Sequence, residues 1–386
     1  MIYPSNIWSL FNKKEKTLAF GLLVIAMIYF GRAFAHIWGY STLAIDLTLR
    51  YHEIQALFIE GRNIFFENNQ LLYPPSFLFL LTPLIGFFSY YTVEYVWFII
   101  QLLSVAVIIK ESYHLLKNKN PDIGLKYIFL VLVSILAWHS IYQGMGIGQV
   151  TNLLMALFLW SFNSIEGTKH SALRKVAIIY SYTLILGKFT IFLPVFVFLI
   201  FKQKHRPYIY SSVLLNIIIS LGVIFYYELS ITEYITVYIS KFGSGFNSGS
   251  FDLFSVSQFL ELPPLLIYII SISTLLIPLF VGLKNLNTLR GLAITFIVAR
   301  LWIYHGLYDN IMLILVALYL VSIKNIFPIS FFCVLSAILI LPSFIWNTSF
   351  FGLFVQISFS ASLLSALIWC YKNEPTTKRL YNHSGV

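Results

Sequence analysis

The sequence has 386 residues, of which 59% are hydrophobic and only 10% are charged. Soluble globular domains carry about 25% charged residues, so this composition excludes an ordinary water-soluble fold. The formal net charge of +10 does not indicate nucleic-acid binding in so apolar a chain, and we interpret the basic residues as signals of membrane topology.

Twelve apolar runs predict membrane-spanning helices, because a hydrocarbon core about 30 Å thick requires about 20 apolar residues per helix. The runs lie near residues 17–39, 93–110, 126–143, 148–163, 173–187, 189–202, 208–227, 264–283, 288–304, 308–323, 327–346 and 350–371. A thirteenth run, 75–88, is short and follows Tyr73-Pro74, so we expect it to lie on the outer surface. The sequence therefore predicts an all-α polytopic membrane protein, with a single transmembrane domain over residues 1–372 and a cytoplasmic tail over residues 373–386.

The distribution of basic residues predicts the orientation. If the run 75–88 does not cross, 19 of the 25 Lys and Arg residues face one side of the membrane. Such a bias marks the cytoplasmic side. We therefore expect a multi-pass protein of the plasma (inner) membrane with both termini in the cytoplasm.

Two long loops, 40–92 and 227–263, then lie on the outer face and carry most of the acidic residues. Leu47, Tyr51, Ile54 and Leu57 recur at helical spacing in the first loop, which predicts an interfacial helix lying on the membrane. The second loop contains a Gly- and Ser-rich stretch, 242–250, which predicts a mobile lid. We expect the two loops to form the roof of an active site on the outer face.

Asp46 lies where the first span reaches the outer surface. A carboxylate in the first turn of a helix often only complements the helix dipole. At the edge of a partly dry cavity, however, desolvation raises the pKa of such a group towards the range of a general base. Asp46 is therefore the candidate catalytic base, with Glu53 as the alternate.

Lys188 lies between two short apolar runs, where a lysine either extends to the surface or has a functional partner. We interpret it as a fixed cation for a lipid phosphate. Arg300 and His305 lie near the outer ends of later runs and are candidates for the same anion.

Four further polar residues are suited to a sugar or acceptor. Gln149 and Asn152 offer amide groups at the outer end of a span, although polar contacts between helices would explain them equally well. Asp309 follows His305 by four residues and could orient a bound headgroup. Tyr73 precedes the short outer run. No Asp-x-Asp pair or phosphate-binding glycine loop occurs in the sequence, so we expect neither a metal site nor a cofactor.

The order of these motifs resembles the GT-C superfamily of membrane glycosyltransferases, and more narrowly glycosyltransferase family 87, the polyprenyl-phosphate-mannose-dependent mannosyltransferases. The resemblance runs from about Asp46 to about Leu315. It rests on the outer-loop acid, Glu60-Gly61-Arg62-Asn63, Tyr73-Pro74-Pro75, Gly148-Gln149-Val150-Thr151-Asn152, Lys188 and His305-Gly306-Leu307-Tyr308-Asp309. It implies a GT-C-type bundle of about 12 transmembrane helices beneath outer-face juxtamembrane helices, with the first-loop aspartate, here Asp46, as the base. The spacing from Asp46 to Gly61 is one residue longer than the family pattern, which keeps Glu53 open as the base.

The resemblance implies an integral membrane enzyme that moves a sugar from a polyprenyl-phosphate carrier to an envelope lipid or glycan acceptor. The sugar would be mannose or another hexose or pentose, and transfer would be inverting and metal-independent. A secondary transporter is an alternative, but such proteins often consist of two related halves and the sequence contains no repeat. A lipid-linked polysaccharide polymerase or ligase is another, but the outer loops are not rich in arginine.

Overall fold

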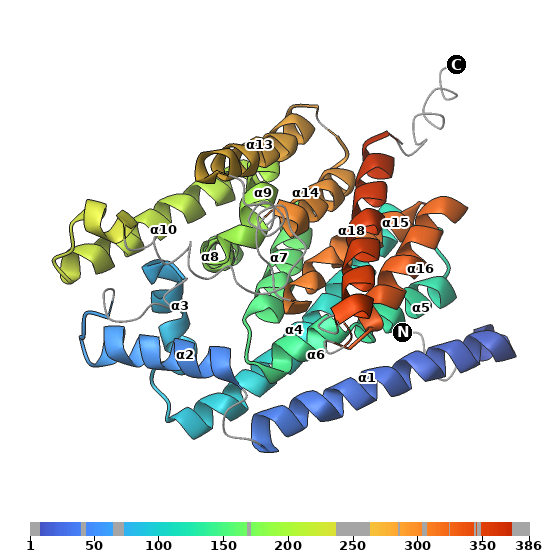
Figure 1. The fold of residues 1–386 in the computed structure, drawn as a ribbon, viewed down its shortest axis with the longest axis horizontal. Coiled ribbons are helices and arrows are strands. Elements are labelled where there is room, and N and C mark those ends of the chain that lie inside the picture. Colours follow the sequence, from blue (N-terminus) through green and yellow to red (C-terminus); the bar gives the residue numbers. More distant parts are fainter. Residues whose placement is uncertain are drawn as a thin grey trace.

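The computed structural model describes residues 8–39, 44–64, 73–167, 171–236, 263–284, 286–302, 307–323, 325–342, 345 and 349–372. The described part of the chain is helical and contains no β-strand (Figure 1). The predicted all-α fold is therefore confirmed. The predicted mobile stretch 242–250 and the tail 373–386 lie outside the described residues.

The helices follow the predicted apolar runs closely. After a short 3₁₀ turn, Trp8–Leu10, they are α1 (Lys13–Gly39), α2 (Ile45–Ile54), the π-helical turn η3 (Gln55–Ile59), α3 (Pro75–Ile85), α4 (Tyr90–Lys119), α5 (Leu125–Leu136), α6 (His139–Gly146), α7 (Thr151–Glu166), α8 (Ala172–Leu186), α9 (Phe189–Leu199), α10 (Arg206–Tyr226), α13 (Pro264–Leu283), α14 (Thr288–Trp302), the 3₁₀ helix η4 (Leu307–Leu313), α15 (Ile314–Ser322), α16 (Ile326–Ile340) and α18 (Ser349–Lys372). The helix predicted in the first outer loop is present as α2 and η3.

The predicted number of about twelve spans is not confirmed. Among the described residues, four helices are long and apolar enough to cross a membrane: Lys13–His36, Tyr90–Lys119, Arg206–Tyr226 and Phe354–Lys372. The pair α5 and α6, bent by 42°, could form a fifth. The runs near 148–163, 173–187 and 189–202 form the shorter helices α7, α8 and α9; α9, with 11 residues, is roughly 17 Å long at 1.5 Å per residue. Sequence hydropathy does not register the turns at which these helices end.

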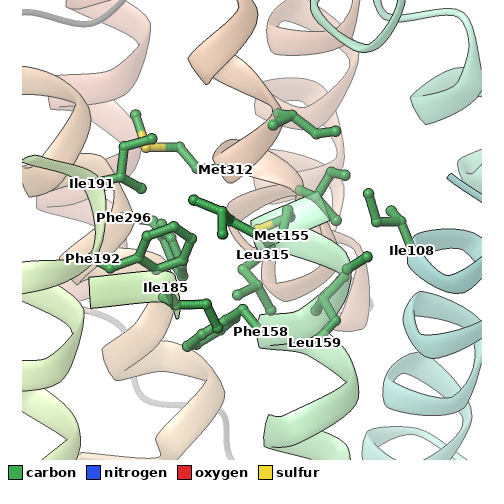
Figure 2. Packing of buried hydrophobic residues seen from close by; sticks show 14 of the residues in the cluster. Ile108, Met155, Phe158, Leu159, Ile185, Ile191, Phe192, Phe296, Met312 and Leu315 are labelled. Carbon is green, nitrogen blue, oxygen red and sulfur yellow. The ribbon is translucent and has the colours of Figure 1, made fainter. Parts of the chain in front are cut away.

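The interior is built around α7, which packs against α4 and α8. Phe158 on α7 lies with its ring centroid 5.6 Å from Phe192 on α9 and 5.5 Å from Phe296 on α14. Figure 2 shows these rings converging with Met155 and Leu159 in one apolar layer. Tight packing of this kind fixes the position of α7. The polar residues at the N-terminal end of α7 are therefore held in a defined place.

Candidate functional site

Buried polar side chains gather where four elements meet: the start of α2, the start of α7, the turn between α8 and α9, and η4. The buried members that take part in the contacts described below are Arg50, Glu53, Gln149, Thr151, Lys188 and Asp309. Burying polar and charged groups costs free energy unless they are hydrogen-bonded or paired. The cluster therefore depends on the contacts among its members, and these contacts indicate what it can do.

Asp46 is held by the segment that precedes α7. Its backbone N–H donates to the Ile147 carbonyl at 3.1 Å, and the Gln149 side-chain amide donates to its carboxylate. Between these two partners, Gly148 has a positive φ of 76°, and a Cβ there would lie 2.5 Å from Cβ of Leu47. Only glycine combines this conformation with so close an approach, so Gly148 allows α2 to bring Asp46 against Gln149.

Lys188 is the centre of the hydrogen-bond network. Its ammonium group lies 2.5 Å from Oδ1 of Asp309, 2.7 Å from Oγ1 of Thr151 and 3.3 Å from Oε1 of Gln149. The side chains of Lys188 and Asp309 are both almost fully buried, with relative residue exposures of 8% and 3%. Lys188 is thus a fixed, buried cation with a carboxylate partner, and not a lysine that extends to the surface.

Gln149 links the carboxylate of Asp46 to the ammonium group of Lys188. An amide has donors on nitrogen and an acceptor on oxygen, and here the nitrogen donates to Asp46 while the oxygen accepts from Lys188. The backbone carbonyl of Gln149 also accepts from Gln101 of α4 at 2.8 Å. The opposite charges of its two neighbours determine which end of the amide faces each of them.

The electrostatic surroundings act on Asp46 in both directions. Burial raises the pKa of its carboxyl group above the ordinary aspartate value, while the hydrogen bond from Gln149 and the charges of Arg50 and Lys188 oppose that rise. The nearby charge of Asp309 adds to it. The net direction is upwards, which suits a group that must accept a proton near neutral pH.

A close approach of α3 completes the wall around Lys188. The Tyr73 ring stacks on Phe77, with 4.5 Å between the ring centroids. A Cβ at Gly187 would lie 2.1 Å from the Phe77 ring, so glycine is required at the residue before the lysine. Gly187 therefore lets Phe77, and with it Tyr73, lie against the turn that carries Lys188.

Arg50 and Glu53 form a second buried ion pair on α2. Nη1 of Arg50 donates to Oε2 of Glu53, and the guanidinium lies 4.8 Å from the centroid of the Tyr73 ring. Glu53 is 1% exposed. The alternate base predicted from the sequence is therefore held by an arginine, whereas Asp46 is only half-buried.

The remaining predicted site residues lie apart from these contacts or outside the described residues. Asn152 donates to Oε1 of Gln101 at 2.9 Å and to the Ile141 carbonyl at 3.0 Å, so its amide links α7 to α4 and α6. Arg300 donates to Asn310 at 2.6 Å. His305 lies outside the described residues.

Two members of the cluster were not singled out by the sequence interpretation. Arg50 follows Asp46 by four residues and so shares its helical face, a signal that was available. Thr151 follows Gln149 by two residues, and nothing in the sequence marks its hydroxyl as a partner of Lys188.

Comparison with known proteins gives one result. The family model described as glycosyltransferase family 87 matches residues 71–323, which is about two thirds of the chain. A search of curated proteins finds no match. The matched range includes Gln149, Lys188 and Asp309, and Asp46 precedes it.

Proposed function

The chain belongs to glycosyltransferase family 87, and from this premise we propose that it transfers a sugar from a polyprenyl-phosphate carrier to an envelope lipid or glycan on the outer face of the membrane. The observation that supports the proposal is the network in which a half-buried carboxylate and a buried ammonium group share one amide, Gln149. An acid and a cation side by side are the two groups that transfer from a phosphosugar requires.

The proposed reaction is a direct displacement at the anomeric carbon. The acceptor oxygen attacks that carbon, its proton passes to Asp46, and the bond from the anomeric carbon to the phosphate oxygen breaks. Polyprenyl phosphate departs with the bonding electron pair, and the configuration at the anomeric carbon inverts.

Asp46 is the proposed base because it is more accessible than Glu53. An acceptor hydroxyl must come within hydrogen-bonding distance of the base. Asp46 is half-buried, while Glu53 is 1% exposed and accepts from Arg50. The raised pKa of Asp46 also makes it the stronger proton acceptor relative to an ordinary aspartate.

Lys188 is the proposed electrostatic partner of the departing phosphate. A preorganised cation in a poorly hydrated site stabilises developing negative charge strongly. Thr151 and Asp309 hold the ammonium group in place before the donor arrives. This role assigns no step to a metal ion, so excess chelator should leave transfer unchanged.

The test is sugar transfer by the purified protein in detergent, from a synthetic polyprenyl phosphosugar to an extract of envelope lipids. Asp46→Asn keeps the shape of the side chain and removes the proton acceptor, so turnover should fall by about 100-fold to 10,000-fold. Glu53→Gln is the matched variant, and thermal unfolding of both variants controls for loss of fold. Near-normal transfer by Asp46→Asn would remove Asp46 from the role of base, and loss of transfer by Glu53→Gln alone would reassign it.

The orientation is part of the same proposal, with both termini in the cytoplasm and the site outside. In a background without Cys333 and Cys370, single cysteines at Phe87 and Lys119 separate the two faces. An impermeant thiol reagent applied to intact cells should label Phe87→Cys and not Lys119→Cys. The reverse pattern would put the site on the cytoplasmic face.

A further inference from the structure

A groove of about 550 Å³ lies between η3, α3 and α10. Leu57, Phe58 and Phe79 line one side of it, and Tyr226 and Tyr227 line the other. In Figure 1, α3 lies between α2 and α10, which places the groove beside the helix that carries Asp46. Its volume is within the range of about 300–1,000 Å³ that is usual for ligand sites.

One hydrogen bond joins the walls of the groove, and a second fixes the helical turn beside it. The Tyr227 hydroxyl donates to the Leu57 carbonyl, and Nε2 of Gln55 donates to the Gly86 carbonyl at 2.6 Å. Both bonds brace the π-helical turn, a feature often found at functional sites. The groove is therefore preformed and does not depend on a ligand to open it.

Arg50 lies two helical turns before the groove on the same continuous helix. Arg50 is 5% exposed, and its Nε has no hydrogen-bond partner among the described residues. Only Nη1 donates to Glu53. A guanidinium group has five N–H donors, so other donors remain for a ligand. A buried arginine of this kind is suited to a phosphate, which it binds with planar, paired hydrogen bonds.

We propose that α2 and η3 together bind the carrier of the sugar donor, with Arg50 on the phosphate and the groove around the first isoprene units. The inference rests on the proposed function and names the subsite of its lipid substrate. Arg50 and Leu57 are seven residues apart, roughly 10 Å along the helix axis, so one amphiphile can contact both. A buried cation at one end and an apolar groove at the other complement an anionic head on a hydrocarbon chain.

The walls of the groove favour an isoprenoid as the hydrocarbon chain of the ligand. Phe58, Phe79 and Tyr226 present rings between which the branch methyl groups of an isoprenoid can pack. Tyr226 is also the last residue of the candidate span Arg206–Tyr226, and the ends of spans are where the aromatic belt of membrane proteins lies. A diacyl phospholipid, whose head is also a phosphate, is the competing occupant that the experiment must separate.

The experiment is photolabelling of the detergent-purified protein by polyprenyl phosphate with a diazirine in its isoprene unit nearest the phosphate. The label should appear in peptides that cover residues 57–61 and 219–227, and unlabelled polyprenyl phosphate should compete. Gly222 lines the groove, and a Cβ there meets no atom within 4 Å, so Gly222→Leu should fill the groove and lower labelling about tenfold or more. Gly21→Leu is the control, because a Cβ at Gly21 in α1 also meets no atom within 4 Å.

Arg50 is tested by the charge of the competitor. Arg50→Met should weaken competition by polyprenyl phosphate about tenfold or more, without changing competition by uncharged polyprenol. In Arg50→Lys, competition by polyprenyl phosphate should be weaker than in the wild type and stronger than in Arg50→Met, because an ammonium group keeps the charge and loses the paired geometry.

The outcomes divide clearly. Label in other helices, or equal labelling of Gly222→Leu and wild type, would overturn the subsite. Competition by phosphatidic acid as strong as that by polyprenyl phosphate would overturn the isoprenoid assignment. Labelling needs no sugar transfer, so correct labelling without transfer would refute the proposed function and leave the subsite standing. Normal transfer with labelling unaffected by either variant would refute the subsite alone.

Discussion

Replacing Lys188 by methionine should destabilise the protein through its partner. The substitution keeps the apolar stem and leaves the Asp309 carboxylate, 3% exposed, without its cation at 2.5 Å. Removing one member of a buried pair costs about 3–5 kcal/mol, far more than the 0–1 kcal/mol expected for a surface pair. Lys188→Met should therefore lower the thermal unfolding temperature in detergent by several degrees.

The double variant separates fold from function. Asp309→Asn keeps an oxygen for the Thr151 hydroxyl, which donates at 2.9 Å, and removes the charge that Lys188→Met leaves behind. The Lys188→Met, Asp309→Asn protein should regain most of the lost stability, with a coupling free energy of about 2–3 kcal/mol in the double-variant cycle. It should remain inactive, because the cation proposed for the phosphate is still missing.

Two results would refute this reasoning. If Lys188→Met unfolds at the wild-type temperature, the two groups do not form a buried charged pair. If the double variant transfers sugar at the wild-type rate, Lys188 does not contact the departing phosphate.

Three further expectations concern the surroundings of Asp46 and Lys188. Gly148→Ala forces a Cβ to within 2.5 Å of Cβ of Leu47, and the displacement of α2 should lower transfer by about 100-fold; unchanged transfer would show that α2 need not lie there. Gly187→Ala sets a Cβ 2.1 Å from the Phe77 ring and should raise the donor KM more than it lowers kcat, as steady-state kinetics can determine. Because the pKa of Asp46 is raised and only its ionised form is a base, transfer should decline with falling pH at a higher pH than an exposed aspartate would give. Asp46→Asn should abolish that acid limb in a pH–rate profile.

Sequence periodicity predicted the positions of the helices well, whereas the predicted number of crossings is not confirmed. In the run 126–143 the chain turns at Ala137 and Trp138 between α5 and α6, and hydropathy alone does not show whether such a bent pair crosses as one span. Apolar residues favour burial in lipid and in a protein interior alike. The distinction depends on tertiary packing, which a single run does not encode.

The candidate site was predictable as single residues and not as a network. Asp46, Gln149 and Lys188 each stand out as polar residues at the ends of apolar runs, and the structure brings these three together. The ion pair of Lys188 with Asp309 joins distant positions, and nothing local in either segment indicates it. Asn152 stands out in the sequence for the same reason as Gln149, but its amide donates to Gln101 and to the Ile141 carbonyl and lies outside the network.

The ion pair between Lys188 and Asp309 also has a consequence for the order in which the protein assembles during synthesis. The two residues are 121 positions apart, and ribosomes add about 5–20 residues per second. Lys188 therefore emerges roughly 6–24 s before the carboxylate that neutralises it. During that interval a lysine without its partner is costly to hold within the membrane, so the hairpin of α8 and α9 should remain shallow in the nascent protein. We expect the hairpin to reach its final position only after η4 has been synthesised, so that the site assembles late in membrane insertion.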